Sequence, residues 1–304
     1  MKYFILLSCI AITGLLASCN QGSKKVETRN GLKVPDHVVI VIEENHGYDQ
    51  LIGNATAPYI NALAAEAAVF TDSHGVTHPS QPNYLAFYSG TTMGIPGDQC
   101  LKDTTTPFTT PNLGAALLKN KYTFKGFAQT MPSTGFLDCG YLKSDLTDGT
   151  LYARKHAPWV NWLGNKENNI PDSLSLPMTA FPKDFGQLPT VAFAIPDQDH
   201  DMHNIGKPGD SAAISRGDIW LKENLGAYVE WAKTHNSLLI LTYDEDQFTP
   251  QNHILTLFAG ANVEPGKYSE KINHYSVLNT LEAIYGLHVT DSTNAFVIRD
   301  VWKK

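Results

Sequence analysis

The chain has 304 residues, a length that fits one large domain or two small ones. Apolar residues make up 42% of the sequence and charged residues 17%, which excludes a disordered, fibrous or multi-span membrane protein. The chain has 23 lysines and arginines against 30 aspartates and glutamates, and the net charge of −7 argues against nucleic acid as a partner.

The N-terminus has the pattern of an export signal. Lys2 precedes an apolar run that is too short for an ordinary membrane-spanning helix and ends at Leu16 to Cys19. This ending resembles a bacterial lipobox, which predicts that residues 1–18 are removed and that Cys19 carries a lipid. We therefore expect an exported lipoprotein of the cell envelope, facing the periplasm or the outer surface. A plain signal peptide with an incidental cysteine is the alternative.

Strand and helix signals alternate along the rest of the chain. Val38 to Ile42 is a continuous β-branched run, typical of a strand buried on both faces of a parallel sheet. Further on, the apolar spacing predicts helices over 57–68, 112–118, 215–234 and 275–285, the last one capped by Gly286, and strands at 69–70, 122–127, 190–195, 237–242 and 253–258. This order predicts an α/β fold with a mostly parallel central sheet flanked by helices.

The stretch 94–185 is less regular and rich in threonine, proline and glycine, so we interpret it as an insertion or cap. It holds Cys100 and Cys139, the two cysteines left in the mature folded part. An oxidising compartment allows a disulfide between them, but the residues do not decide whether it forms. Metal binding by the pair is disfavoured, because no further cysteine is available for a thiolate-rich site. The expected division of the chain is a signal over 1–18, a flexible tether over 19–33, and one domain over 34–304 that includes this cap.

Polar residues gather where three predicted strands end. The first strand leads to Glu43, Glu44 and Asn45, the strand at 190–195 to Asp197, Asp199, His200, Asp201 and His203, and the strand at 237–242 to Asp244, Glu245 and Asp246. Ligands bind outside the carboxyl ends of parallel strands, and oxygen-rich groups suit Mg, Ca, Mn or Zn. The joint pattern predicts a divalent metal site. Glu43 or Asp246 taken alone is interpreted as a solvated loop acid.

A fourth element runs from Thr77 to Tyr84 and contains Ser80. Pro82 is tolerated in the first turn of a helix, which places Ser80 at or just before a helix N-terminus. Free N–H groups and the helix dipole attract anions there. Ser80 is therefore either a simple N-cap, or a nucleophile that a metal activates and whose phosphorylated form rests on those N–H groups.

Four elements, in this order, resemble the phosphoesterase family of bacterial and fungal acid phosphatases and phospholipases C. They are Glu44-Asn45-His46-Gly47-Tyr48-Asp49, His78-Pro79-Ser80-Gln81-Pro82-Asn83-Tyr84, Asp201-Met202-His203 with Gly217-Asp218-Ile219-Trp220-Leu221, and Tyr243-Asp244-Glu245. The family belongs to the alkaline-phosphatase superfamily. The resemblance extends from about Val38 to Leu287.

The resemblance implies an alkaline-phosphatase-like sandwich in which a metal-activated serine is phosphorylated and then released by water. Ser80 matches the nucleophile and also a metal ligand. Glu44, Asn45, Asp244 and Glu245 match the remaining metal ligands. One divalent ion is the first expectation, and a second could be held by Asp197, Asp201, His203 and His274.

The same resemblance suggests further residues near the phosphate. Asp201 and His203 match a motif that we take as catalytic, with His203 or His156 protonating the leaving alkoxide. His156 lies in an element that would bind a phosphate oxygen, the alternative being an exposed basic loop. Asn83 is expected to donate a hydrogen bond to the same phosphate.

The expected activity is metal-dependent hydrolysis of phosphate monoesters of small molecules, as in acid phosphatases. A monoesterase must satisfy three terminal oxygens and so needs an extra cation, such as Lys155 or His156. A phosphodiesterase or phospholipase C on the same site is the first alternative, and a non-catalytic surface-binding lipoprotein is the second.

Overall fold

The computed structural model describes residues 1, 26–29, 31–102, 105–289 and 295–304. Residues 2–18 of the predicted signal, Cys19, and residues 20–25 and 30 of the tether lie outside these residues. Within the described part, no helix is long and apolar enough to cross a bilayer.

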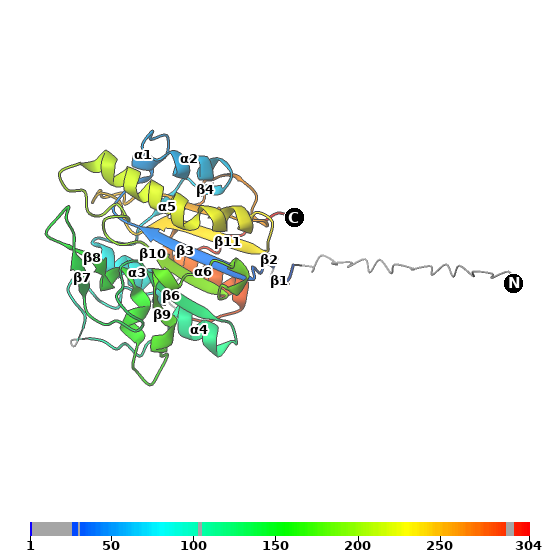
Figure 1. The fold of residues 1–304 in the computed structure, drawn as a ribbon, viewed down its shortest axis with the longest axis horizontal. Helices are drawn as coiled ribbons and strands as arrows, with labels where there is room; N and C mark the ends of the chain where they lie inside the picture. Colours follow the sequence, from blue (N-terminus) through cyan, green and yellow to red (C-terminus); the bar gives the residue numbers. More distant parts are fainter. Residues whose placement is uncertain (2–25, 30, 103–104, 290–294) are drawn as a thin grey trace.

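A sheet of eight strands forms the centre of the molecule, in the order β13-β4-β12-β11-β3-β10-β6-β9 (Figure 1). The five strands from β11 to β9 run parallel, whereas β12 is antiparallel to both of its neighbours. The prediction of a mostly parallel sheet is confirmed. The strands are β3 His37–Glu43, β4 Ala68–Phe70, β6 Phe124–Ala128, β9 Ser175–Pro177, β10 Val191–Ile195, β11 Ser237–Tyr243, β12 Thr256–Ala259 and β13 Gly266–Tyr268.

Helices cover both faces of this sheet, as Figure 1 shows. The helices are α1 Tyr48–Leu51, α2 Pro58–Ala65, α3 Ser80–Ser89, α4 Leu113–Lys119, α5 Asp210–Ala232 and α6 His274–Tyr285. Successive residues of β3 face opposite layers: Ile40 packs in the core with α3, α4 and α6, and Val41 packs with α2 and α5. Because both layers are apolar, the strand is buried along nearly its whole length and the sheet ends become the natural place for polar groups.

Asp218 on α5 caps α2 from outside that helix. Its carboxylate accepts hydrogen bonds from the N–H groups of Tyr59 at 3.1 Å and Ile60 at 2.7 Å. These N–H groups lie in the first turn of α2, where they have no partner inside the helix. Asp218, one of the residues quoted for the family resemblance, therefore has a structural task, which is to join α2 to α5.

The stretch 94–185 is more than an insertion beside the sheet, since β6 and β9 within it are strands of the central sheet. It also carries a separate antiparallel hairpin, β7 Gly140–Lys143 with β8 Thr150–Ala153. A disulfide joins Cys100 to Cys139 across 39 residues, which settles the alternative that the sequence left open. The remaining short strands are β1 Thr28–Arg29, β2 Leu32–Lys33, β5 Ser73–His74 and β14 Ile272–Asn273.

Candidate active site

The three strands whose ends carry the predicted ligands are direct neighbours. β3 lies between β10 and β11 and is parallel to both. Beyond the strand ends, the Asp244 N–H donates to the Glu43 carbonyl at 3.0 Å, and the Glu44 N–H donates to the Asp201 carbonyl at 2.8 Å. These bonds continue the sheet by one step and hold the polar segments together at one edge.

Ser80 is surrounded by the predicted metal ligands. Its hydroxyl donates to Glu44 Oε2 at 2.9 Å and to Glu245 Oε1 at 3.1 Å, and lies 3.5 Å from Asn45 Oδ1. Ser80 is the first residue of α3, and Pro79 takes the N-cap position without a side-chain cap. The simple N-cap interpretation of Ser80 is therefore wrong, because its hydroxyl faces carboxylates and not the helix backbone.

The N-terminus of α3 offers fewer donors to an anion than predicted. The Asp98 carboxylate already accepts from the Gln81 N–H at 2.8 Å, and Pro82 has no N–H group. The other Asp98 oxygen pairs with Lys155 Nζ at 2.6 Å. Asp98 thus links the start of α3 to the segment that carries His156.

Asp244 is held by backbone contacts on both sides. Its Oδ1 accepts from the Asn45 N–H at 3.2 Å, and its own carbonyl lies 2.6 Å from Nε2 of buried His274. Burial lowers the pKa of His274 to about 4, so the ring is neutral and donates one hydrogen bond to this carbonyl. His274, which we considered for a second metal, thus positions the Asp244 segment.

Burial and the charge of neighbouring carboxylates raise the pKa values of Asp244 and Glu245. Asp244 is fully buried, and desolvation followed by the charges of Glu44 and Glu245 raises its pKa well above the ordinary value. Desolvation and the Glu44 charge raise the pKa of Glu245 to about 7. A bound cation would compensate this accumulated negative charge.

His78 is a residue of the site that the sequence reasoning did not assign. Its Nδ1 lies 2.5 Å from Glu245 Oε2, its Nε2 lies 3.1 Å from the Thr249 carbonyl, and its ring stacks on Phe248 with centroids 4.8 Å apart. His78 therefore orients Glu245. The sequence contained one signal for this role: His78 lies two residues before Ser80, inside the element that resembles the family.

His156 is buried and not part of an exposed basic loop. Its Nε2 lies 3.0 Å from Glu44 Oε1 and its Nδ1 3.1 Å from Asp201 Oδ2, while its ring stacks on Tyr84. Burial lowers its pKa well below the ordinary value, so the ring is neutral. This makes His156 unsuited to protonating a leaving group at neutral pH.

Three other residues were candidates for a second metal. Asp201 lies close to Glu44, because the His156 ring contacts both carboxylates. Asp197 is engaged elsewhere, by the His200 ring at 2.6 Å and the Thr130 hydroxyl at 2.5 Å. His203 is half-buried, with its ring centroid 6.0 Å from that of His156.

Asn83 supports the loop in front of Ser80. Its Oδ1 accepts from the N–H groups of Val76 and Thr77, and its Nδ2 donates to the carbonyls of Thr77 and Pro79. All hydrogen-bonding positions of the amide are thereby used. Our expectation that Asn83 contacts phosphate finds no support in these contacts, and we assign it to holding the Ser80 loop.

Glu43 and Asp246 lie outside the cluster, but neither is a solvated loop acid. Glu43 is completely buried, and neither of its carboxyl oxygens has a hydrogen-bond partner among the residues that the structure describes. Asp246 is buried as well and accepts from the N–H groups of Thr249 and His253, which closes the loop after β11. The sequence could not show that this edge is covered.

The donor set fits a divalent cation. Among the described residues, buried Asp244 Oδ2 has no hydrogen-bond partner, and Glu44 Oε1 and Asp201 Oδ2 contact only the His156 ring, at 3.0 and 3.1 Å, without forming a well-aligned hydrogen bond. Ligand atoms of Glu44, His156 and Asp201 all lie within 4.8 Å of one another. Orphaned oxygens around Ser80 are the environment that a hard or borderline ion satisfies, and Glu44 faces both groups of donors.

Comparison with known sequences identifies relatives among phosphatases. Residues 54–288 match the Phosphoesterase family. A phosphatidylinositol-3-phosphatase of Mycobacterium tuberculosis is 47% identical over 269 residues, which are 88% of this chain and 82% of that protein. An acid phosphatase of Aspergillus fumigatus is 26% identical over 233 residues, 74% of this chain and 50% of the relative. The chain thus spans about half the length of that fungal relative.

Solved structures share the fold. A Vibrio parahaemolyticus protein of the alkaline phosphatase superfamily superposes with a TM-score of 0.54 at 15% identity, covering 83% of this chain and 67% of that one. The lipoteichoic acid synthase from Listeria monocytogenes gives a TM-score of 0.55 at 12% identity, covering 86% and 74%. The expected alkaline-phosphatase-like architecture is confirmed.

Proposed function

The chain belongs to the phosphoesterase family, and on this premise we propose that it is a metal-dependent phosphate monoesterase with Ser80 as its nucleophile. The observation that carries the proposal is the Ser80 hydroxyl, which is surrounded by oxygens of Glu44, Glu245 and Asn45 within 3.5 Å. A buried serine at the start of a fully buried helix has no structural need for two carboxylates.

Ser80 attacks the phosphorus in line and becomes phosphoserine, which water then hydrolyses. The hydroxyl proton passes to Glu44 or Glu245, the carboxylates to which it already donates. A divalent ion bound by Glu44, Asn45, Asp244 and Glu245 would lower the pKa of the Ser80 hydroxyl and neutralise phosphate charge.

His203 is the residue that we assign to protonating the leaving alkoxide. It is half-buried and lies next to the neutral His156. Lys155 supplies a cation for the terminal oxygens of a monoester. Burial opposes its positive charge, but Glu44 and Asp98 outweigh that effect and leave the pKa of Lys155 raised.

The relatives favour monoesters over the alternatives. The Mycobacterium protein is named a phosphatidylinositol-3-phosphatase and the fungal ones acid phosphatases, and both names describe release of phosphate from a monoester. They favour neither a phosphodiesterase nor a non-catalytic lipoprotein. We take a phosphorylated small molecule or lipid headgroup as the substrate class.

The test compares phosphate release from p-nitrophenyl phosphate, phosphatidylinositol 3-phosphate and bis-p-nitrophenyl phosphate, before and after chelation. Both monoesters are expected to be hydrolysed faster than the diester, and activity is expected to disappear with chelator and return with added metal. Acid quenching during turnover of a ³²P-labelled monoester should leave the label on the Ser80 peptide.

The matched control uses two serines of one helix. Ser80→Ala should abolish turnover and labelling, whereas Ser89→Ala should preserve both, because Ser89 only donates to the carbonyls of Leu85 and Thr91. Full turnover in Ser80→Ala would exclude the phosphoserine route. Faster hydrolysis of the diester would show that the protein is a phosphodiesterase and contradict the monoesterase proposal.

Export and anchoring through a lipid on Cys19 remain part of the proposal. The disulfide between Cys100 and Cys139 supports an oxidising compartment. Mass spectrometry of the mature N-terminal peptide, with Cys19→Ser as control, tests the anchor. An unmodified Cys19 in a soluble exported protein would contradict it.

A further inference from the structure

A cavity of about 290 Å³ is lined by two residues that are linked to the site, Gln81 and Lys155, and the charge of Glu44 acts on Lys155. Gln81, which follows Ser80 in the chain, lines one side, and Lys155, which precedes His156, lines another. The volume lies at the lower end of the roughly 300–1,000 Å³ that ligand sites usually have, so it accommodates one ring and not a long chain.

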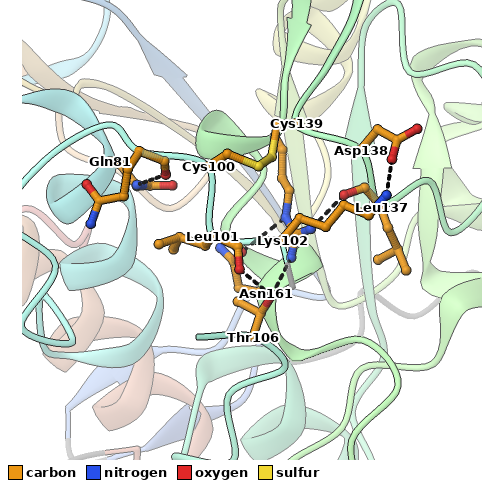
Figure 2. The surroundings of a disulfide bond; sticks show 11 residues. Gln81, Cys100, Leu101, Lys102, Thr106, Leu137, Asp138, Cys139 and Asn161 are labelled. Atoms are coloured by element: carbon orange, nitrogen blue, oxygen red, sulfur yellow. Dashed lines mark hydrogen bonds and ion pairs between the residues drawn. A yellow bond between two sulfur atoms is a disulfide. The ribbon is translucent and has the colours of Figure 1, made fainter. Parts of the chain in front are cut away.

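The disulfide forms part of the apolar wall of this cavity. Cys100 and Cys139 line it together with Leu101 and Ala153, and Figure 2 shows Gln81 beside Cys100. A non-polar wall of this kind suits the C–H face of a saturated ring.

Arg154 holds the segments that form the disulfide wall of the cavity. Its guanidinium donates to the Leu137 carbonyl at 2.6 Å, the Thr106 hydroxyl at 3.0 Å and Asn161 Oδ1 at 3.2 Å. Its N–H donates to the Cys139 carbonyl. The two segments joined by the disulfide are therefore also joined by hydrogen bonds, and Arg154 has a bracing role.

The polar groups of the cavity include three side-chain amides, those of Gln81, Gln99 and Gln198, beside the charged Asp98, Arg154 and Lys155. Gln81 Nε2 donates to the carbonyls of Gly97 and Gln99, and Gln198 Nε2 donates to the Thr150 carbonyl at 2.7 Å. Within the described part of the chain, no group donates a hydrogen bond to the Oε1 atom of Gln81 or Gln198. These oxygens accept hydrogen bonds, which matches hydroxyl groups.

We propose that this cavity is the leaving-group subsite and that it binds a ring-sized polyol, such as a cyclitol or a sugar, esterified to the phosphate. This inference rests on the proposed function. The uncharged amides accept hydrogen bonds from hydroxyl groups, whereas Lys155, held by Asp98 at 2.6 Å, stays charged for the phosphate end of the ester. Among the described residues that line the cavity none is aromatic, so a nucleobase would find no stacking partner.

The experiment fills the cavity mouth and compares two substrates that differ only in the alcohol. Gln99 is exposed at the rim, so Gln99→Trp adds bulk without disturbing the core. We expect kcat/KM for myo-inositol monophosphate to fall at least 10-fold, whereas kcat/KM for methyl phosphate, whose alcohol is too short to enter, changes less than 2-fold. Gln187→Trp, at another exposed glutamine away from the cavity, should change neither.

Two results would overturn the inference. One is an unchanged kcat/KM for inositol phosphate in Gln99→Trp, and the other is an equal loss for both esters. Failure of the unmodified protein to hydrolyse either ester or p-nitrophenyl phosphate would instead count against the proposed function.

The source of the ring is decided by a further arm with vesicles that contain phosphatidylinositol 3-phosphate. If Gln99→Trp lowers kcat/KM by a similar factor on vesicles and on the free ester, a lipid headgroup is an occupant of the cavity. Loss on the free ester alone assigns the cavity to soluble polyol phosphates.

Discussion

The site joins two regions that are held in place by different means. The ends of β3 and β11 carry Glu44 and Asp244, which are fully buried and fixed by the backbone hydrogen bonds of neighbouring parallel strands. The cavity rim at Gln99 and Cys100 is exposed and depends on a covalent cross-link. The comparison teaches that the sheet positions the reacting groups, whereas the cross-linked segment selects the alcohol. Changes in the two regions should therefore separate turnover from selectivity.

The largest effect is expected at the sheet edge. Asp244→Asn removes one ligand charge and should lower kcat/KM about 10³-fold for every ester, because metal stabilisation of the transition state contributes several kcal/mol. Added Mn²⁺ at about 100 Kd should stabilise the parent protein by about 2.7 kcal/mol, and this gain should be lost in the variant. Phosphate release and thermal unfolding with and without Mn²⁺ measure both effects.

Asp199→Asn provides the control for that change. Asp199 follows β10 but accepts hydrogen bonds from Ser144 and Asn204, away from Ser80. The Asp199→Asn variant should still be stabilised by Mn²⁺ as the parent protein is. Equal losses in the two variants would mean that the strand ends act only as structural elements.

The second effect isolates the cross-linked region. Replacing both cysteines, Cys100→Ser with Cys139→Ser, should lower the free energy of unfolding by about 3 kcal/mol, because the disulfide closes a long loop in the unfolded chain. Turnover of methyl phosphate should change less than 2-fold while the KM for inositol phosphate rises. Urea unfolding and steady-state kinetics test this; a parallel loss for both esters would contradict the separation of the two regions.

His78 sharpens the comparison within the sheet edge. Loss of a residue that orients a metal ligand typically costs 10–100-fold, so His78→Ala should reduce kcat/KM and metal affinity by about that factor. His78→Asn retains a donor near the Nδ1 position and should recover part of both. Metal titration by calorimetry is the direct readout. If Asn recovers nothing, the hydrogen bond to Glu245 is not what His78 supplies.

The smallest effect concerns a support behind the edge. Asp218→Ala leaves the N–H groups of Tyr59 and Ile60 without their acceptor and should lower the free energy of unfolding by about 1–2 kcal/mol. Turnover should stay within 2-fold at a temperature where the variant is folded. A large loss of kcat without a loss of stability would place Asp218 in the catalytic machinery.

The sequence by itself determined the parallel strands, the polar residues at their ends and the serine at the start of a helix. These features are local: a run such as Val38 to Ile42 has no alternative to burial, and a chain that leaves such a strand must do so at the sheet edge. All five residues predicted as metal ligands, Glu44, Asn45, Ser80, Asp244 and Glu245, accordingly lie together.

Only the tertiary structure decided which groups are left free to act. Asn83 and His274 have the right chemistry, but loop and backbone partners use their hydrogen bonds, and His156 is buried between two carboxylates. His78 became part of the site because the loop after β11 brings Glu245 and Phe248 to it. The cavity beside the disulfide has no local pattern at all, since its walls come from segments far apart in the chain. Such contacts depend on three-dimensional packing, which residue type and spacing do not encode locally.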